Sequence, residues 1–131
     1  FSSPAFSETI ISCGPTKGYA FYFEGGFVPK DKSGWSDDGT SGGQTVLIKV
    51  DEKFDILYRD AAGQIVSSRA DGASVNLLGF KAPWINILVN YPNATSSFYS
   101  FNIVEKIFAY SQHKYGDMPI RKVGSYFGKC K

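Results

Sequence analysis

The segment Gly39-Thr40-Ser41-Gly42-Gly43 matches the pattern G-x-S-x-G, in which a serine can serve as the nucleophile of a hydrolase. That chemistry requires a strand before the serine, a helix after it and a histidine that accepts the hydroxyl proton. Here the β-branched and aliphatic residues of 45–50 predict a strand after the serine, and the single histidine, His113, follows much later in the chain. We therefore interpret the segment as a glycine-rich turn and predict no catalytic residue.

Acidic residues near this segment could bind a metal ion. Asp37 and Asp38, with Asp31 upstream, could offer oxygen ligands to Ca²⁺. Their spacing fits no calcium-binding loop, because no acid stands at the twelfth position, and Asp-Asp-Gly is also ordinary turn composition. One histidine and two distant cysteines do not have the spacing of a zinc site. We predict neither a metal site nor a cofactor.

A pair of carboxylates could also perform glycosidase-type acid and base catalysis. Such a pair must face each other across a cleft, about 5–9.5 Å apart. The chain has twelve acidic residues, and most of them flank predicted turns, where water is their usual environment. Glu24 differs, because it ends an aromatic strand beside a glycine-rich segment. A small hydrolase built on such a pair is the weakest of three functional hypotheses.

Aromatic side chains with polar neighbours form the remaining candidate site. Trp35 lies in a glycine-rich segment, and Trp84 shares one face of a predicted strand with Asn86 and Asn90. An exposed tryptophan beside amides could stack on a sugar ring or anchor a protein partner. Alternatively, Trp35 covers one end of the fold and Trp84 packs under a loop. The predicted ligand-binding residues are Tyr22, Glu24, Trp35, Asp37, Asp38, Trp84 and Asn86.

The composition indicates one globular domain spanning residues 1–131. A chain of this length is usually a single domain, and 43% hydrophobic residues with 20% charged residues are sufficient for a core. Aromatic residues reach 16%, with eleven Phe and eight Tyr. Because these residue types favour pleated, half-buried surfaces, the composition favours strands.

The polarity pattern predicts where those strands lie. Residues 1–16 contain two prolines and no periodicity, so we expect a lead-in segment, followed by an aromatic strand at 19–23. Residues 25–44 are rich in glycine and predict a long loop, with room for one short strand around Phe27. After that the alternation is regular, and turns separate the predicted strands, which are 45–50, 54–59, 64–69, 73–80, 83–91, 98–104, 107–114 and 120–127.

This spacing predicts an all-β fold, a single-domain antiparallel meander of about eight or nine strands. An up-and-down β-barrel of the lipocalin or calycin type is favoured over a β-sandwich, because the turns are short and closure removes unpaired edges. Residues 104–114 also fit helical spacing, with Val104, Ile107, Phe108 and Ser111 on one face. We predict a strand there, because the preceding strand pattern runs directly into it.

The two cysteines, Cys13 and Cys130, are expected to form a disulfide between the margins of the β pattern. This bond would join the first and last strands and so fit a closed barrel. Disulfides persist in oxidising compartments, so we predict a secreted or periplasmic protein. The alternative is a pair of free buried thiols. The sequon Asn93-Ala94-Thr95 would matter only in a eukaryotic secretory route.

The charge distribution gives little evidence about partners. The net charge is only +2, so we predict no nucleic-acid partner. From Ser100 onward there are six basic and two acidic residues, which we interpret as lysines on outward strand positions. No stretch approaches the roughly 20 apolar residues of a membrane helix, so we predict no transmembrane segment.

Together these patterns favour a secreted or periplasmic, non-enzymatic binding domain for a small molecule or glycan. The ligand would lie at one end of the barrel or on an aromatic face, with segment 25–44 as a rim, since small barrels either fill with side chains or hold one small ligand. The second hypothesis is a protein-interaction or enzyme-inhibitor module that uses segment 25–44 or the basic C-terminal strands.

Overall fold

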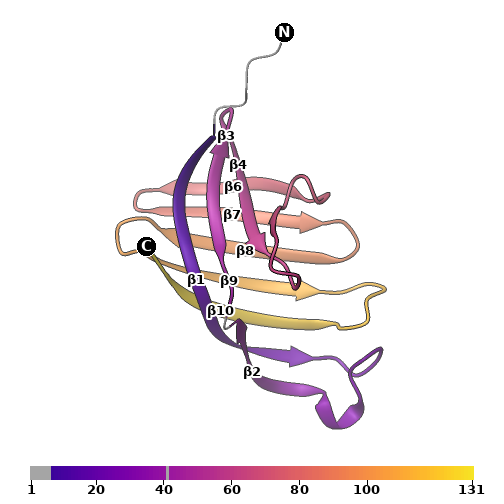
Figure 1. Ribbon diagram of the computed structural model, residues 1–131. Helices are drawn as coiled ribbons and strands as arrows, with labels where there is room; N and C mark the ends of the chain where they lie inside the picture. Colours follow the sequence, from indigo (N-terminus) through magenta and orange to yellow (C-terminus); the bar gives the residue numbers. More distant parts are fainter. Residues whose placement is uncertain (1–6, 41) are drawn as a thin grey trace.

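The computed structural model describes residues 7–40 and 42–131, which fold almost entirely into antiparallel strands (Figure 1). The strands are β1 (Ser7–Tyr22), β2 (Gly34–Thr40), β3 (Thr45–Val50), β4 (Lys53–Arg59), β5 (Ile65–Ser67), β6 (Ser74–Lys81), β7 (Trp84–Tyr91), β8 (Thr95–Asn102), β9 (Ile107–Lys114) and β10 (Lys122–Cys130). One 3-10 turn, η1 (Lys30–Lys32), precedes β2. No helix in the described part of the chain is long and apolar enough to cross a membrane. The predicted all-β class is confirmed.

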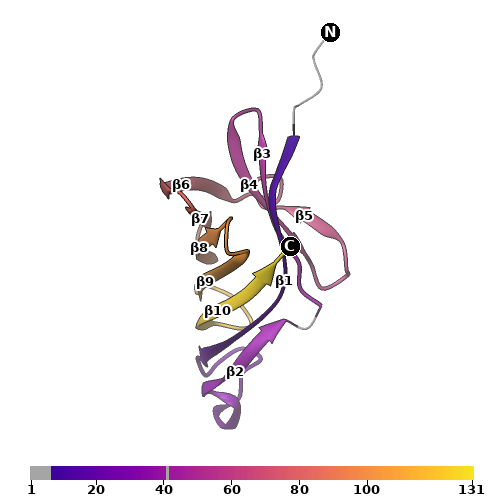
Figure 2. The same ribbon diagram turned by 90° about the vertical axis from the view of Figure 1, so that its left-hand side faces the viewer.

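The strands form one sheet in the order β5-β4-β3-β1-β10-β9-β8-β7-β6. The long strand β1 organises it, because its first part pairs with β3 and its last part with β2, on the side opposite β10. Figure 2 shows that the sheet curls strongly, so that its concave face encloses an interior. The predicted antiparallel meander is therefore present as an open half-barrel.

The first and last strands pair, as the sequence predicts, and Cys13 is bonded to Cys130 across them. The opening of the half-barrel lies instead in the middle of the chain, between the β4–β5 side and β6. Arg69 bridges this opening, because its Nε donates to the carbonyl of Phe54 on β4 and its Nη2 donates to that of Val75 on β6. Two charge-assisted hydrogen bonds thus replace the strand pairing that a closed barrel would have.

Apolar side chains fill one half of the interior. The core residues with the largest buried side chains are Phe101, Phe108, Ile11, Leu47, Ile56 and Ile87. The ring of Phe108 lies over Gly128, where an added Cβ would come within 2.5 Å of the ring, so this position on β10 requires glycine. Because these side chains pack at the end of the barrel near the disulfide, the opposite end remains available for a site.

Two segments differ from the sequence-based expectation. Most of segment 1–16, expected as a lead-in, belongs to β1, and its first six residues lie outside the described part of the chain. Segment 25–44, expected as a long loop, contains η1 and β2. One of its glycines, Gly39, allows close strand packing, since an added Cβ would lie 2.4 Å from the backbone oxygen of Thr16. The strand predicted over 107–114 is confirmed as β9.

Candidate functional site

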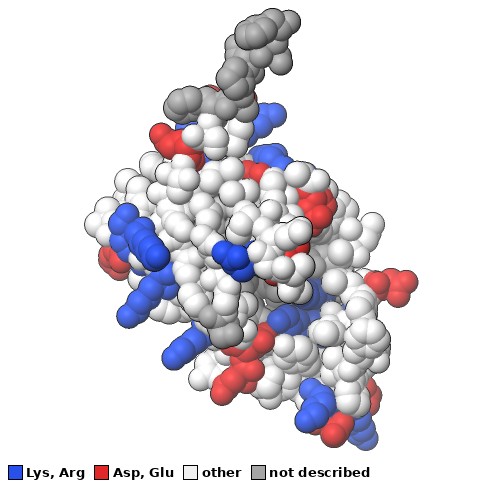
Figure 3. Space-filling view, in the orientation of Figure 1, with Lys and Arg blue, Asp and Glu red and all other residues white. Residues whose placement is uncertain are grey.

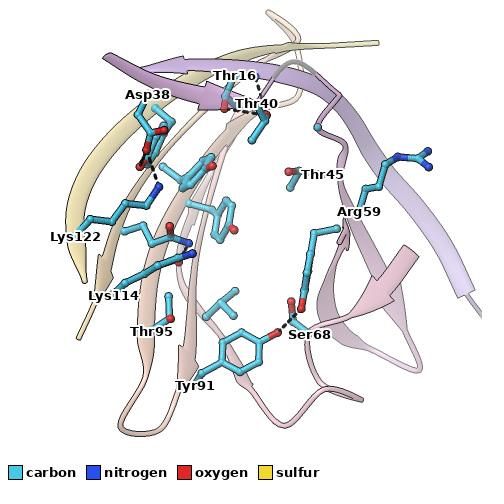
Figure 4. Close-up of a pocket in the computed structure, with 18 of the residues that line it drawn as sticks. Thr16, Asp38, Thr40, Thr45, Arg59, Ser68, Tyr91, Thr95, Lys114 and Lys122 are labelled. Atoms are coloured by element: carbon cyan, nitrogen blue, oxygen red, sulfur yellow. Dashed lines mark hydrogen bonds and ion pairs between the residues drawn. The ribbon is translucent and has the colours of Figure 1, made fainter. Parts of the chain in front are cut away.

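A pocket of about 490 Å³ occupies the interior beyond the apolar core (Figure 4). One wall is the inner face of β7 to β10, and the other consists of parts of β1, β2, β3 and β4 and the turn that follows β5. The curvature of the sheet brings these walls together although they are distant in the chain. The pocket therefore exists because the half-barrel is wider than its aromatic core can fill.

The side chains on the floor of the pocket change from apolar to polar to basic along the strands. Antiparallel partners lie side by side, so inward residues of β8, β9 and β10 form rows across the sheet. From the core outward the rows are Phe101, Phe108 and Gly128; then Tyr99, Tyr110 and Tyr126; then Ser97, Gln112 and Gly124; then Thr95, Lys114 and Lys122. The surface thus runs from apolar, through tyrosine and neutral polar groups, to basic at the rim.

The tyrosine row is a continuous stack of rings. The ring centroids of Tyr99 and Tyr110 lie 4.9 Å apart, and those of Tyr110 and Tyr126 lie 4.7 Å apart. Burial raises the pKa of all three hydroxyl groups above the ordinary value of 10.0. The stack is therefore uncharged at physiological pH and offers flat apolar surface together with hydroxyl groups.

An ion pair with a tyrosine lies at the basic end of the pocket. Lys122 Nζ is 2.6 Å from Asp38 Oδ2, and the Tyr126 hydroxyl donates to the same oxygen at 2.7 Å. Burial alone would raise the pKa of Asp38, but the hydrogen bonds from Lys122 and Tyr126 lower it below 3.8. Burial alone would lower the pKa of Lys122, but the hydrogen bond to Asp38 raises it above 10.5. Both partners are charged at neutral pH.

Replacement of this acid tests the pair. Asp38→Asn is expected to reduce the free energy of unfolding by about 1.5 kcal/mol at neutral pH, because the amide cannot match the charge of Lys122. The folded-state pKa of Asp38 lies below 3.8. Its stabilisation is therefore complete above that value and is lost as the pH falls through the folded-state pKa. Urea denaturation of both proteins over a pH series measures the difference, which should shrink only in strongly acidic solution. A difference that is the same at every pH would contradict the charged pair.

Lys114 lies next to this pair. It lies directly opposite Lys122 on β10 and Thr95 on β8. Figure 4 shows its side chain running beside that of Lys122 into the cavity. Among residues 7–40 and 42–131 no hydrogen bond or ion pair to its ammonium group is found. Burial lowers its pKa, Lys122 lowers it further, and Asp38 opposes the shift.

Of the residues predicted from sequence, Asp38 lines the pocket. Tyr22 lies beside it, since the Lys122 ammonium is 5.4 Å from the centre of its ring. Trp35 is 74% exposed and points outward, with its ring edge-on to Phe21. Asp37 pairs in register with Tyr19 on the same outer face. Of the three candidates in segment 25–44, Asp38 therefore faces the pocket, and Trp35 and Asp37 face outward.

The other predicted residues lie away from the pocket. The side chain of Glu24 is exposed just beyond β1, and its carbonyl accepts a hydrogen bond from Arg121. Trp84 and Asn86 lie on the convex face of β7, where the Asn86 amide oxygen accepts a hydrogen bond from Ser100. Ser41 lies outside the described residues.

Sequence reasoning missed Lys114, Lys122 and the tyrosine row. The signal was present, because Phe108, Tyr110, Gln112 and Lys114 alternate along one strand and must share a face. The lysines of the C-terminal strands were instead interpreted as solvated outward residues. An inward lysine at the end of an aromatic face is the feature that the alternation could have identified.

The pocket offers binding groups rather than an evident catalytic pair. Its two acidic side chains are engaged separately, Asp38 with Lys122 and Asp71 with the Tyr58 hydroxyl at 2.9 Å. No group of three metal-binding side chains occurs within the described ranges. Arg59 points away from the cavity in Figure 4 and donates to the Gln44 side chain. Comparisons of the chain with protein-family models, with curated proteins and with solved structures found no match.

Proposed function

We propose that this domain binds a small molecule in the half-barrel pocket without transforming it. The observation that carries the proposal is the pocket of about 490 Å³ that remains beyond an otherwise well-filled core. Ligand pockets for small organic molecules typically measure roughly 300–1,000 Å³ and combine apolar walls with a few polar groups. Stacked tyrosines, hydroxyl and amide groups, and lysines give this pocket that combination.

The disulfide supports an extracytoplasmic location for this function, because such bonds persist in oxidising compartments. A binding domain outside the cytoplasm would meet its ligand in dilute solution, where a preformed pocket avoids the cost of ordering the site. Alkylation of free thiols in freshly harvested cells that produce the protein tests the location. Two unreacted cysteines support it, and two alkylated cysteines contradict it.

The binding proposal is tested by filling the pocket. Thr45 and Thr95 line it from opposite walls, so Thr45→Trp and Thr95→Trp each place an indole in the cavity. Thr9 is exposed on β1, and Thr9→Trp is the matched control. We expect ligand-observed NMR with a library of drug-sized molecules to give hits that both filled variants lose and the control keeps. The proposal fails if no hit shows this dependence.

A second candidate function is protein interaction, and an aromatic cluster outside the barrel favours it. Trp35 is 74% exposed and Phe23 is 41% exposed, and Phe21 contacts these two residues at ring-centre distances of 5.4 and 5.3 Å. Exposed aromatic clusters of this kind are frequent anchors in protein interfaces. A partner found by cross-linking should bind the purified domain, and Trp35→Ala should weaken that binding at least tenfold if this cluster is the anchor.

A further inference from the structure

The basic end of the pocket holds more positive than negative charge. Lys114 and Lys122 occupy directly opposed positions on β9 and β10, and both side chains enter the cavity. The carboxylate of Asp38 is bonded to Lys122 and to the Tyr126 hydroxyl, so it is already engaged twice. On the opposite wall, Asp71 accepts from the Tyr58 hydroxyl. Neither acid of the pocket is bonded to Lys114.

An arrangement of this kind is unfavourable for the free protein. Like charges directly opposite each other on neighbouring strands destabilise a sheet. A half-buried ammonium group to which no described residue is hydrogen-bonded also loses hydration, and Asp38 offsets only part of that cost. Its pKa is lowered for the same reasons, first by burial and then by Lys122. A lysine in an outward position would avoid both costs, so the inward position requires another explanation.

We infer that the ligand of this pocket carries an anionic oxygen group, a carboxylate, sulfonate or phosphate, which pairs with Lys114 while its flat apolar body lies along the tyrosine row. This inference rests on the proposed binding function. The anion supplies a partner that Lys114 lacks among residues 7–40 and 42–131, and a charge pair in a partly desolvated pocket is stronger than one at the surface. Figure 3 shows basic atoms within a hollow near the centre of the molecular face drawn there, so an anion can approach from solvent.

The spacing of the rows sets the shape of the ligand. Tyr110 and Lys114 lie four residues apart on β9, which corresponds to about 13 Å between their α-carbons. The lysine side chain spans part of this separation. A molecule with one or two fused or linked rings and a terminal oxyanion therefore fits between the tyrosine row and the ammonium group, with Ser97 and Gln112 available for hydrogen bonds along its length.

A matched pair of fluorescent probes tests the charge requirement. Anilinonaphthalene sulfonate is anionic, and N-phenylnaphthylamine has the same ring system without the charge. We expect wild-type protein to bind the sulfonate at least about tenfold more tightly, and Lys114→Met to remove that preference while leaving the affinity for the neutral probe within about twofold. Lys129→Met, an exposed lysine of β10, is the control that should change neither affinity.

Competition identifies the kind of oxyanion. Benzoate and phenyl phosphate should displace the sulfonate probe from wild-type protein, and whichever is stronger indicates a carboxylate or a phosphate ligand. Benzyl alcohol, which is neutral, should displace it poorly. Equal displacement by all three compounds would overturn the inference.

The same lysine variant has a second readout that needs no ligand. Lys114→Met removes the unpaired charge, so its urea denaturation midpoint should rise above that of wild-type protein, whereas Lys129→Met should leave it unchanged. A lower midpoint for Lys114→Met would show that the lysine has a stabilising partner in the fold and would overturn the inference.

The outcomes separate this inference from the proposed function. If the neutral probe binds as tightly as the sulfonate, and Thr45→Trp abolishes both, the pocket binds ligands but the anion requirement is wrong. If neither probe responds to Thr45→Trp or Thr95→Trp, the probes do not occupy the pocket and the inference fails. The binding proposal fails only if no molecule of the NMR library depends on these positions either.

Discussion

Replacement of both Cys13 and Cys130 by alanine is expected to lower the free energy of unfolding by about 4–5 kcal/mol. The bond closes a loop across a sequence separation of 117 residues, so its loss frees nearly the whole described chain in the unfolded state. Stabilities of small domains are commonly about 5–15 kcal/mol, so this loss removes a large part of the total. Urea denaturation of the oxidised wild-type protein and the variant measures it.

Wild-type protein reduced with a thiol provides the control for packing. Cys13 is only 2% exposed, so its replacement by alanine also removes buried volume. Reduced wild-type protein keeps both sulfur atoms and loses only the cross-link, and we expect it to account for most of the decrease. A reduced protein as stable as the oxidised one would show that the cross-link contributes nothing beyond the β1–β10 pairing.

Asp55→Ala is expected to lower the free energy of unfolding by about 3 kcal/mol, which is the second largest of the expected effects. This carboxylate is 6% exposed and organises the turn at the opening of the half-barrel. It accepts hydrogen bonds from the backbone N–H groups of Ile56 and Arg69 and from the Ser67 hydroxyl. Its loss leaves three donors without their acceptor and loosens Arg69, which bridges β4 and β6.

Two further variants distinguish the loss of the buried hydrogen bonds of Asp55 from the loss of any aspartate that accepts hydrogen bonds in a turn. Asp60 also accepts two backbone hydrogen bonds in a nearby turn, from Ala62 and Gln64, but it does so near the surface. Asp60→Ala should therefore cost less than about 1 kcal/mol, because water can replace the lost bonds. Asp55→Asn keeps one acceptor oxygen and should fall between the two. Equal losses for Asp55→Ala and Asp60→Ala in urea denaturation would refute the special role of Asp55.

The strands after Gln44 could be predicted from sequence because their information is local. Ile85, Ile87 and Val89 recur at every second position, and the structure buries that face. The position of the opening could not be predicted, because it depends on which distant strands pair. Asp55 illustrates the difference, since it lies within a predicted strand and nothing in the local pattern indicates the three donors from two chain segments that surround it.

The candidate site was predictable only in part for the same reason. Asp38 was singled out for its position in a glycine-rich segment, and its actual partners, Lys122 and Tyr126, lie more than 80 positions away in the chain. Trp35 and Trp84 drew attention as large aromatic residues, whereas the rings that line the pocket are tyrosines. Residue type alone does not tell which face of a strand a side chain occupies when both faces carry aromatic residues.

The position of β1 in the sheet has a consequence for biosynthesis. Its residues from Cys13 to Tyr22 pair with β10, so the β1–β10 pairing cannot be completed until residue 130 has left the ribosome. The β6–β10 hairpins consist of sequence-adjacent strands and can form as they emerge, since local pairings close quickly. Cotranslational folding should therefore stop at partial sheets, and the interior with its pocket should assemble only after translation of these strands is complete.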